Sequence, residues 1–325
     1  MAQHQDTWPV AVLCEVLAVS RSGFDADRQG QATVDIDVAE VTLVARVKAM
    51  ATQTGHSYGS RRMATQLQVE GDAVGRYKAR RLMQQAGVSV RRRKRCPVTT
   101  DSRHGYAVAP NLLARQFDVA QPDTVWVGDI TYVWTAEGWE YLAVLLDLHS
   151  RKVVGWAMQS RIDAALVQEA LRMALGRRRP SAGLIHHSDR GSQYACHAYQ
   201  TLLAENGIRC SMSRKGECLD NAVAERFFGS VKGERTALRH YATRQEARDD
   251  VVEYIEMFYN SKRLHSYLGY VSPNDFERLG KVAYLTVRFY LTITRSPSQR
   301  TAHARVASHF GSASSPCRLL FRLNR

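Results

Sequence analysis

Apolar positions in the first ninety residues recur at the three- to four-residue spacing of helices. Residues 8–24 predict a short helix, a turn and the start of another helix, and residues 38–53 predict a longer helix with an apolar stripe. Two more short helices are expected within residues 56–71 and 74–90, with basic side chains placed off the apolar positions. Short basic helices in series are typical of a helix-turn-helix, although a solvated helical bundle fits the same pattern.

The pattern changes after a basic, aperiodic stretch that predicts a linker. Beyond it, residues 124–133, 139–150 and 151–160 predict three antiparallel strands, followed by helix, strand, helix, strand and helix. We expect Asp220 to cap the last of these helices. This order predicts an α/β, ribonuclease-H-like fold, with a five-stranded mixed sheet flanked by helices and preceded by small all-α helix-turn-helix segments.

Composition narrows the class of partner. The 325 residues carry a net charge of +14, which favours a polyanionic partner such as nucleic acid. The six cysteines are scattered without a Cys-x-x-Cys motif, as expected in a reducing cytosol. No apolar run approaches the roughly 20 residues that span a bilayer, and the first residues do not resemble a signal peptide. We therefore expect a cytoplasmic protein.

Three acidic residues stand out on the predicted fold. Asp129 lies inside an apolar strand, where a lone carboxylate costs several kcal/mol, Asp189 ends the fourth strand, and Glu225 lies early on the last helix. Converging carboxylates repel one another, and a divalent cation removes that repulsion. Oxygen ligands favour Mg²⁺ or Mn²⁺, and two such ions about 4 Å apart support phosphodiester chemistry.

Each acid also has an ordinary interpretation when it is taken alone. Asp189 can cap a turn, Glu225 can lie on a solvated helix face, and Asp129 can pair with an arginine. Asp147 also follows an apolar strand, but "DLHSRK" predicts a hairpin turn there, so we do not expect it to be a ligand. His187 shares a strand face with Asp189 and is either an outer support of the site, a substrate-facing residue or a core histidine.

Five long motifs follow one another in the core: "VWVGDITYV", "LAVLLDLHSRKVVGW", "HHSDRGSQY", "SMSRKGECLDNAVAERFFGSVKGE" and "FYNSKRLHSYLGYVSPNDF". In this order they resemble the OrfB-type transposases of bacterial insertion sequences, members of the DDE superfamily with a retroviral-integrase-like catalytic core. The resemblance covers about residues 10–280, and the 35 residues between Asp189 and Glu225 match the D-x35-E spacing of that superfamily. It implies that Asp129, Asp189 and Glu225 are the catalytic residues and hold two divalent ions, Mg²⁺ or Mn²⁺. Asn221 is expected to support them from outside.

The chain departs from the family pattern at four positions. Gly128 stands where threonine is common, Glu217 and Leu219 vary the loop before the last helix, and Arg226 replaces a frequent small residue. None of these departures alters the three acidic residues, so the expected chemistry is unchanged.

The resemblance implies double-stranded DNA, both the element ends and the target, as the partner. Lys232 lies two helical turns after Glu225 and is expected to meet a DNA phosphate. The other basic residues expected to bind DNA are Arg61, Arg62, Arg80, Arg81, Lys262 and Arg263. A homo-oligomer on DNA is expected. An OrfA partner or frameshift fusion is implied as well, because this chain resembles the downstream half of the usual fusion and shows no sustained heptad.

We therefore expect a helix-turn-helix DNA-binding region at 1–90, a basic linker at 91–121, a DDE catalytic core with C-terminal helices at 122–283 and a poorly ordered basic tail at 284–325. From residue 286 the tail has seven arginines but no lysine or acid. This composition favours translation past a frame disruption, with a basic DNA-binding tail as the alternative. The expected function is metal-dependent hydrolysis and strand transfer at insertion-sequence ends. A ribonuclease-H-like nuclease and an inactive DNA-binding remnant are the alternatives.

Overall fold

The computed structural model describes residues 8–32, 37–90, 105–215 and 217–282. The expected basic tail and residues 91–104 of the expected linker lie outside the described residues. Residues 105–121 form turns and bends without a helix or strand. Within the described ranges, no helix combines the length and apolar character needed to cross a membrane.

The helices of the N-terminal part form where the apolar spacing predicts them. Asp37 begins the longest one by accepting hydrogen bonds from the N–H groups of Ala39 and Glu40. The third, fourth and fifth helices bury a shared apolar core that includes Val47, Leu67 and Leu82. The five helices are α1 (Val10–Val16), α2 (Arg21–Ala32), α3 (Val38–Gln53), α4 (Ser60–Val69) and α5 (Arg76–Gln85).

A five-stranded mixed sheet lies at the centre of the remaining chain, in the order β3-β2-β1-β4-β5. The first three strands are antiparallel neighbours, while β4 pairs in parallel with β1, and β5 pairs in parallel with β4. This arrangement confirms the expected mixed sheet. The strands are β1 (Val125–Thr135), β2 (Gly138–Asp147), β3 (Val153–Gln159), β4 (Ile185–Ser188) and β5 (Arg209–Met212).

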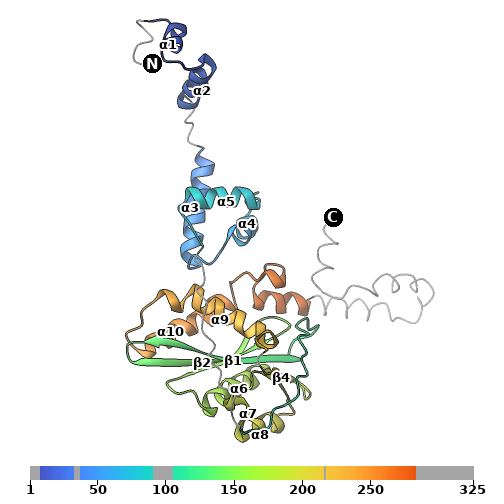
Figure 1. The fold of residues 1–325 in the computed structure, drawn as a ribbon. Helices are drawn as coiled ribbons and strands as arrows, with labels where there is room; N and C mark the ends of the chain where they lie inside the picture. Colours follow the sequence, from blue (N-terminus) through green and yellow to red (C-terminus); the bar gives the residue numbers. More distant parts are fainter. Residues whose placement is uncertain (1–7, 33–36, 91–104, 216, 283–325) are drawn as a thin grey trace, which may run out of the picture.

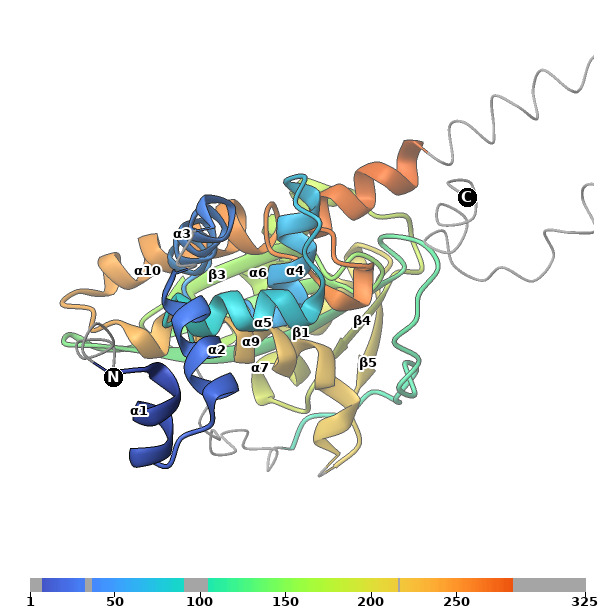
Figure 2. The same cartoon turned by 90° about the horizontal axis from the view of Figure 1, so that it is seen from above.

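Helices cover both faces of the sheet (Figure 1). One apolar core joins the sheet to α6 (Ala164–Arg178), α7 (Ser192–Ala195) and α8 (His197–Glu205). The second core, on the opposite face, joins it to α9 (Ala222–Glu234) and α10 (Arg244–Glu253). Figure 2 looks down on the molecule from the side on which α3–α5 lie.

The last predicted helix is shorter than expected. Single-turn helices, η2 (Cys218–Asn221) and η3 (Thr236–Leu238), flank α9. The expected cap by Asp220 is wrong, because this buried carboxylate accepts hydrogen bonds from the side chains of Asn111, Arg115 and Arg214 instead. Asp220 therefore fastens the segment before β1 to the start of α9.

Three further helical elements complete the described chain. They are the π-helical stretch η4 (Tyr254–Tyr259), η5 (Ser266–Leu268) and a helix over 273–282.

The helices α3–α5 pack on the segment that follows η4. Leu264 belongs to their apolar core, and its backbone N–H donates to the hydroxyl of Tyr58 at 2.9 Å. Next to it, the buried guanidinium of Arg263 makes two hydrogen bonds with the carboxylate of Glu234, at 2.8 and 2.6 Å. Since Glu234 ends α9, this ion pair ties the helix that carries Glu225 to the segment on which α3–α5 rest.

Candidate active site

Parallel pairing of β1 with β4 aligns the two aspartates. The parallel pairing ends with Val127 opposite His187, and Asp129 and Asp189 each lie two residues beyond that pair. Asp189 directly follows β4, and its Oδ1 accepts a hydrogen bond from the N–H of Gly191 at 2.9 Å. The turn-cap interpretation of Asp189 is thus confirmed, and the cap holds its carboxylate beside the middle of β1.

Glu225 lies in the first turn of α9, and its side chain is exposed. Burial raises the pKa of Asp129 well above its ordinary value, and the carboxylates of Asp189 and Glu225 raise it further. Hydrogen bonding from the N–H of Ile130 and the positive charge of Lys232 act in the opposite direction. The fold therefore brings the carboxylates of Asp189 and Glu225 within electrostatic range of Asp129.

A glycine precedes Asp129 for a steric reason. A Cβ at Gly128 would lie only 2.7 Å from Nε2 of His186, which is hydrogen-bonded to the hydroxyl of Tyr199 at 3.1 Å. Burial lowers the pKa of His186 to about 3, so the ring is neutral. The imidazole thus occupies the space that a side chain at position 128 needs, which accounts for the glycine at this position.

Asn221 lies against the same strand. Its Nδ2 donates to the backbone carbonyl of Gly128 at 3.4 Å, while its Oδ1 is buried and has no hydrogen-bond partner in the described structure. An unpaired buried acceptor costs roughly 1–3 kcal/mol, so this oxygen marks a place where a donor or a cation is favoured. The expected position of Asn221 beside the carboxylates fits this geometry.

His187 is held inside the protein. Nδ1 lies 2.8 Å from Oγ of Ser211, Nε2 lies 3.2 Å from Oγ of Ser213, and burial lowers its pKa to about 4. These contacts are those of a neutral core histidine, one of the alternatives that the sequence leaves open. A role in supporting Asp189 stays a prediction.

The donor set fits a hard divalent cation. Among the residues that the structure describes, no three His, Cys, Asp or Glu side chains are gathered tightly enough to form a ready-made metal site. The carboxylates of Asp189 and Glu225, together with that of Asp129 on which they act, offer only oxygen ligands. The unpartnered Oδ1 of Asn221 adds a further oxygen nearby. Mutual repulsion of the carboxylates is the physical reason for a cation to bind among them.

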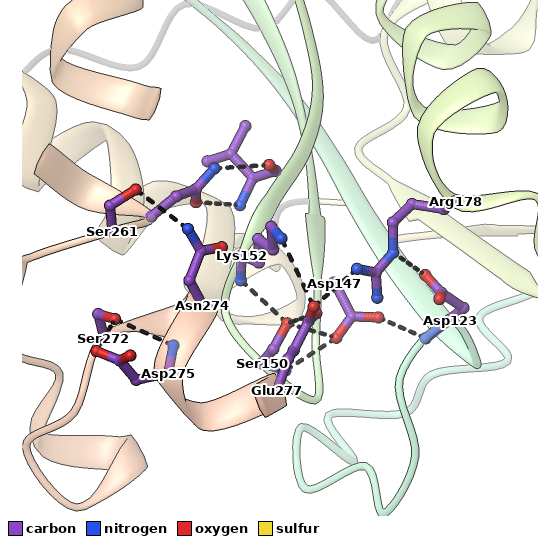
Figure 3. Close-up of polar contacts among 12 residues, drawn as sticks. Asp123, Asp147, Ser150, Lys152, Arg178, Ser261, Ser272, Asn274, Asp275 and Glu277 are labelled. Carbon is purple, nitrogen blue, oxygen red and sulfur yellow. Dashed lines mark hydrogen bonds and ion pairs between the residues drawn. The ribbon is translucent and has the colours of Figure 1, made fainter. Parts of the chain in front are cut away.

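Asp147 has a structural role (Figure 3). Its carboxylate accepts hydrogen bonds from the N–H of Asp123 at 2.6 Å and from the N–H and hydroxyl of Ser150 at 2.8 and 3.0 Å. Arg178 bridges Asp123 and Glu277, and Oγ of Ser150 also lies 2.8 Å from Oε1 of Glu277. This network closes the β2–β3 turn, as the sequence predicts, and fastens the helix over 273–282 to the sheet, which the sequence does not reveal.

Lys232 extends from α9 toward the outer part of the β1–β2 hairpin. Its Nζ lies 4.2 Å from the centroid of the Tyr132 ring, a cation–π contact. The ammonium also lies close enough to Asp129 to lower the pKa of that carboxyl. The expected phosphate contact of Lys232 stays a prediction.

The expected DNA-binding residues fall into two groups. Arg61, Arg80, Arg81 and Lys262 are exposed, and Arg81 is paired with Glu40 on α3 at 2.6 Å.

Burial separates the other two arginines from this group. The expectation that Arg263 binds DNA is wrong, because its side chain is only 6% exposed and is engaged by Glu234. Arg62 is partly buried over the ring of Tyr58, and burial together with the charge of Arg263 lowers its pKa.

Comparison with known proteins agrees with this geometry. Models of the integrase core domain match residues 119–218 and 206–273, and a model of an HTH-like domain matches residues 39–95. An uncharacterized 31 kDa protein of insertion element IS600 from Shigella sonnei is 42% identical over 264 residues, which cover 81% of this chain and 97% of that protein. The transposase InsF for insertion sequence IS3A from Escherichia coli (strain K12) is 37% identical, over 85% of this chain and 96% of InsF.

A third relative and two solved structures are also similar. The transposase for insertion sequence element IS904 from Lactococcus lactis is 40% identical, over 72% of this chain and 92% of that protein. The catalytic core domain of BIV integrase is 19% identical with a TM-score of 0.38, over 50% of this chain and 99% of that one. The HTLV-2 integrase catalytic core in complex with magnesium is 17% identical with a TM-score of 0.35, over 45% and 91%.

An integrase core preceded by an HTH-like domain is the architecture of a DDE-type polynucleotidyl transferase. The chain belongs to the IS3 family of insertion-sequence transposases. It is thus a DNA transposase, and neither a simple nuclease nor an inert remnant is favoured.

Proposed function

We propose that Asp129, Asp189 and Glu225 are the catalytic carboxylates of this transposase and hold two divalent metal ions, Mg²⁺ or Mn²⁺. The observation that carries the proposal is that the carboxylates of Asp189 and Glu225 both lie close enough to Asp129 to raise the pKa of its carboxyl. The unpartnered Oδ1 of Asn221, next to the backbone of Gly128, supports it independently. When bound, the ions would lower the pKa of an attacking hydroxyl and stabilise the leaving oxygen.

The reaction consists of two phosphodiester exchanges. Water attacks the phosphorus at an element end, a new P–O bond forms, and the bond to the 3′-oxygen breaks to release a 3′-hydroxyl. That hydroxyl then attacks a phosphodiester of the target, and the target's own 3′-oxygen leaves. The cap from Gly191 to Asp189 and the packing of His186 behind Gly128 hold two of the carboxylates in place during both exchanges.

DNA is recognised mainly by the helical part. We propose that 1–90 is the DNA-binding region, 91–121 a linker and 122–283 the catalytic unit. The fifth helix presents the exposed side chains of Arg76, Lys78 and Arg80 on its surface, and Tyr77 beside them is 84% exposed. Together with the net charge of +14, these side chains suit a phosphate backbone.

Assembly and location follow from the substrate. We propose that the chain works as a homo-oligomer on paired element ends, with an OrfA partner or as a frameshift fusion. The DNA of a bacterial cell lies in its cytoplasm, so the protein acts there, bound to the nucleoid.

The test is a cleavage and joining assay. A labelled duplex that carries the DNA flanking the gene is incubated with the protein and a supercoiled plasmid, in Mg²⁺, in Mn²⁺ and in EDTA. We expect nicked ends and end–plasmid joints with either ion and none in EDTA, while a duplex with a scrambled end is not joined. Joining in EDTA would contradict the proposal, and hydrolysis without joints would indicate a nuclease.

A further inference from the structure

Three aromatic side chains form an open cluster on the outer part of the β1–β2 hairpin. Trp134 is 56% exposed and Trp139 is 43% exposed. Their ring centroids lie 4.8 Å apart, and the rings of Tyr132 and Trp139 lie 4.8 Å apart, both pairs edge to face. Exposing two tryptophans beside each other is unfavourable in water, and such patches commonly mark an interaction surface.

The other face of the hairpin is fastened to α10 and to Tyr241 just before that helix. Glu140 is buried there and pairs with Arg248 at 2.6 Å, while the N–H of Ala136 donates to the carbonyl of Tyr241 at 2.9 Å. Figure 1 shows the hairpin running out beneath α10 and past α6. The three aromatic side chains therefore lie on the same face of the sheet as α6. This helix covers the face near the middle of the sheet and leaves it open at the hairpin.

This cluster lies next to the candidate active site. In the described part of the chain β4 pairs only with residues 125–127 of β1, so β1 continues beyond Gly128 as an edge. Lys232 comes from α9, which lies on the opposite face of the sheet, and its Nζ lies 4.2 Å from the ring centroid of Tyr132 beside this edge. Along the strand, Tyr132 is roughly 10 Å and Trp134 roughly 17 Å from Asp129, whose carboxylate points to the other face of β1, so DNA that reaches both must pass around this edge.

We propose that Tyr132, Trp134 and Trp139 form a stacking platform for unpaired bases of the DNA next to the scissile phosphodiester. In this arrangement the ammonium of Lys232 neutralises the charge of a neighbouring phosphate. This inference rests on the proposed function. Aromatic rings gain affinity by stacking on bases, whatever their sequence, and a nearby cation suits the phosphate between them. Both faces of a base inside a duplex are already covered by its neighbours, so the platform takes bases that have left the stack. At a stacked rise of 3.4 Å, its distance from Asp129 corresponds to roughly three to five nucleotides.

The platform would separate the strands at the element end. Unpairing a few flanking nucleotides costs free energy, and stacking on the exposed rings offsets it. The structure thus assigns to this platform, which lies outside the helix-turn-helix, a preference for DNA ends that are frayed or carry an overhang. No base-specific hydrogen bond is required for that selection.

The test compares three DNA probes in Ca²⁺ buffer: a blunt 30-base-pair duplex, the same duplex with a five-nucleotide overhang, and a five-nucleotide single strand. The double variant Trp134→Ala, Trp139→Ala is compared with the wild-type chain and with Ile162→Ala, which removes another exposed apolar side chain. We expect the double variant to lose roughly 5- to 150-fold in affinity for the overhang duplex and little for the blunt duplex. The overhang should also quench tryptophan fluorescence of the wild-type chain more than the blunt duplex does.

Two results would overturn the proposal. The first is equal loss on blunt and overhang duplexes, or no loss on either. The second is a wild-type chain that dimerises in sedimentation while the double variant does not, with unchanged preference for the overhang, because the patch would then be a contact between copies. Binding in Ca²⁺ is measured without catalysis, so failure of strand transfer in the assay above would contradict the proposed function and leave the overhang preference as a separate result.

Discussion

The imidazole of His186 leaves no room for a side chain at Gly128, since a Cβ on the glycine would lie 2.7 Å from the imidazole Nε2. The variant Gly128→Ala therefore forces the buried ring or the strand beside Asp129 to move. Overpacking of this kind costs about 1–3 kcal/mol of unfolding free energy, and strand joining should fall as well. Chemical denaturation measures the first effect and the joining assay the second.

The matched control is Gly176→Ala within α6, where nothing lies within 4 Å of the added Cβ. Alanine in a helix interior is expected to leave stability unchanged or to raise it by roughly 0.5–1 kcal/mol. A Gly128→Ala variant as stable and active as that control would refute the steric explanation.

The buried pair of Arg263 and Glu234 should be essential to stability. Replacing Arg263 with alanine leaves the Glu234 carboxylate buried without its main partner, which costs about 3–5 kcal/mol. The neighbouring Lys262→Ala variant removes an exposed lysine and should unfold like the wild-type chain. Urea titration of both variants is the measurement, and equal midpoints would show that the pair contributes nothing.

The ion pairs of Asp220 predict a pH dependence. Hydrogen bonds from Arg214 and Arg115 hold the pKa of Asp220 well below its ordinary value of 3.8. Because the folded pKa is lowered, the carboxylate stabilises the fold above the ordinary pKa, and that contribution is lost as the pH falls toward the folded pKa. The stability difference between wild type and Asp220→Asn should thus be full near neutral pH and shrink below about pH 4.

Thermal unfolding at a series of pH values tests this prediction. The control Asp249→Asn alters an exposed aspartate of α10 and should show a small difference that does not vary in the same way. A difference between wild type and Asp220→Asn that grows on acidification would contradict the sign of the effect.

The salt dependence of DNA binding distinguishes a residue that contacts a phosphate from one that only adds to the overall charge. Arg80 on α5 is exposed, and replacing it with alanine should weaken binding to the end duplex and reduce the slope of log K against log salt by about 0.9. Arg177→Ala on α6, whose guanidinium pairs with Glu256, should leave the slope unchanged. Equal slopes for Arg80→Ala and wild type would exclude the contact.

Elements with strong local periodicity could be predicted from the sequence. The helix predicted at 38–53 is observed at those bounds, because its apolar stripe and the capping Asp37 are both local signals. The order of strands follows from apolar runs separated by turns. The position of Asp189 at the end of a strand could be predicted because it ends such an apolar run. Its turn cap could be predicted as well, because the N–H that it accepts from lies only two residues away.

Contacts between distant segments could not be predicted. Arg115 reaches Asp220 across more than a hundred residues, so the sequence offered only a local cap as the role of that acid. Burial of Arg263 depends on the packing of η4 and α9, which no periodicity encodes. The sequence shows that the hairpin contains two tryptophans, but it does not show that they are exposed, because their exposure depends on where α6 covers the sheet.

The joining assay on carboxylate variants tests the assignment of the three acids most directly. Asp129→Asn, Asp189→Asn and Glu225→Gln each keep the size of the side chain and remove its charge, and Asp249→Asn serves as the matched control. In Mg²⁺, the wild type and the control should join the labelled end duplex to plasmid, while each of the three variants should bind the duplex but form no detectable joints. Joining at the wild-type level by any one of the three folded variants would contradict the assignment.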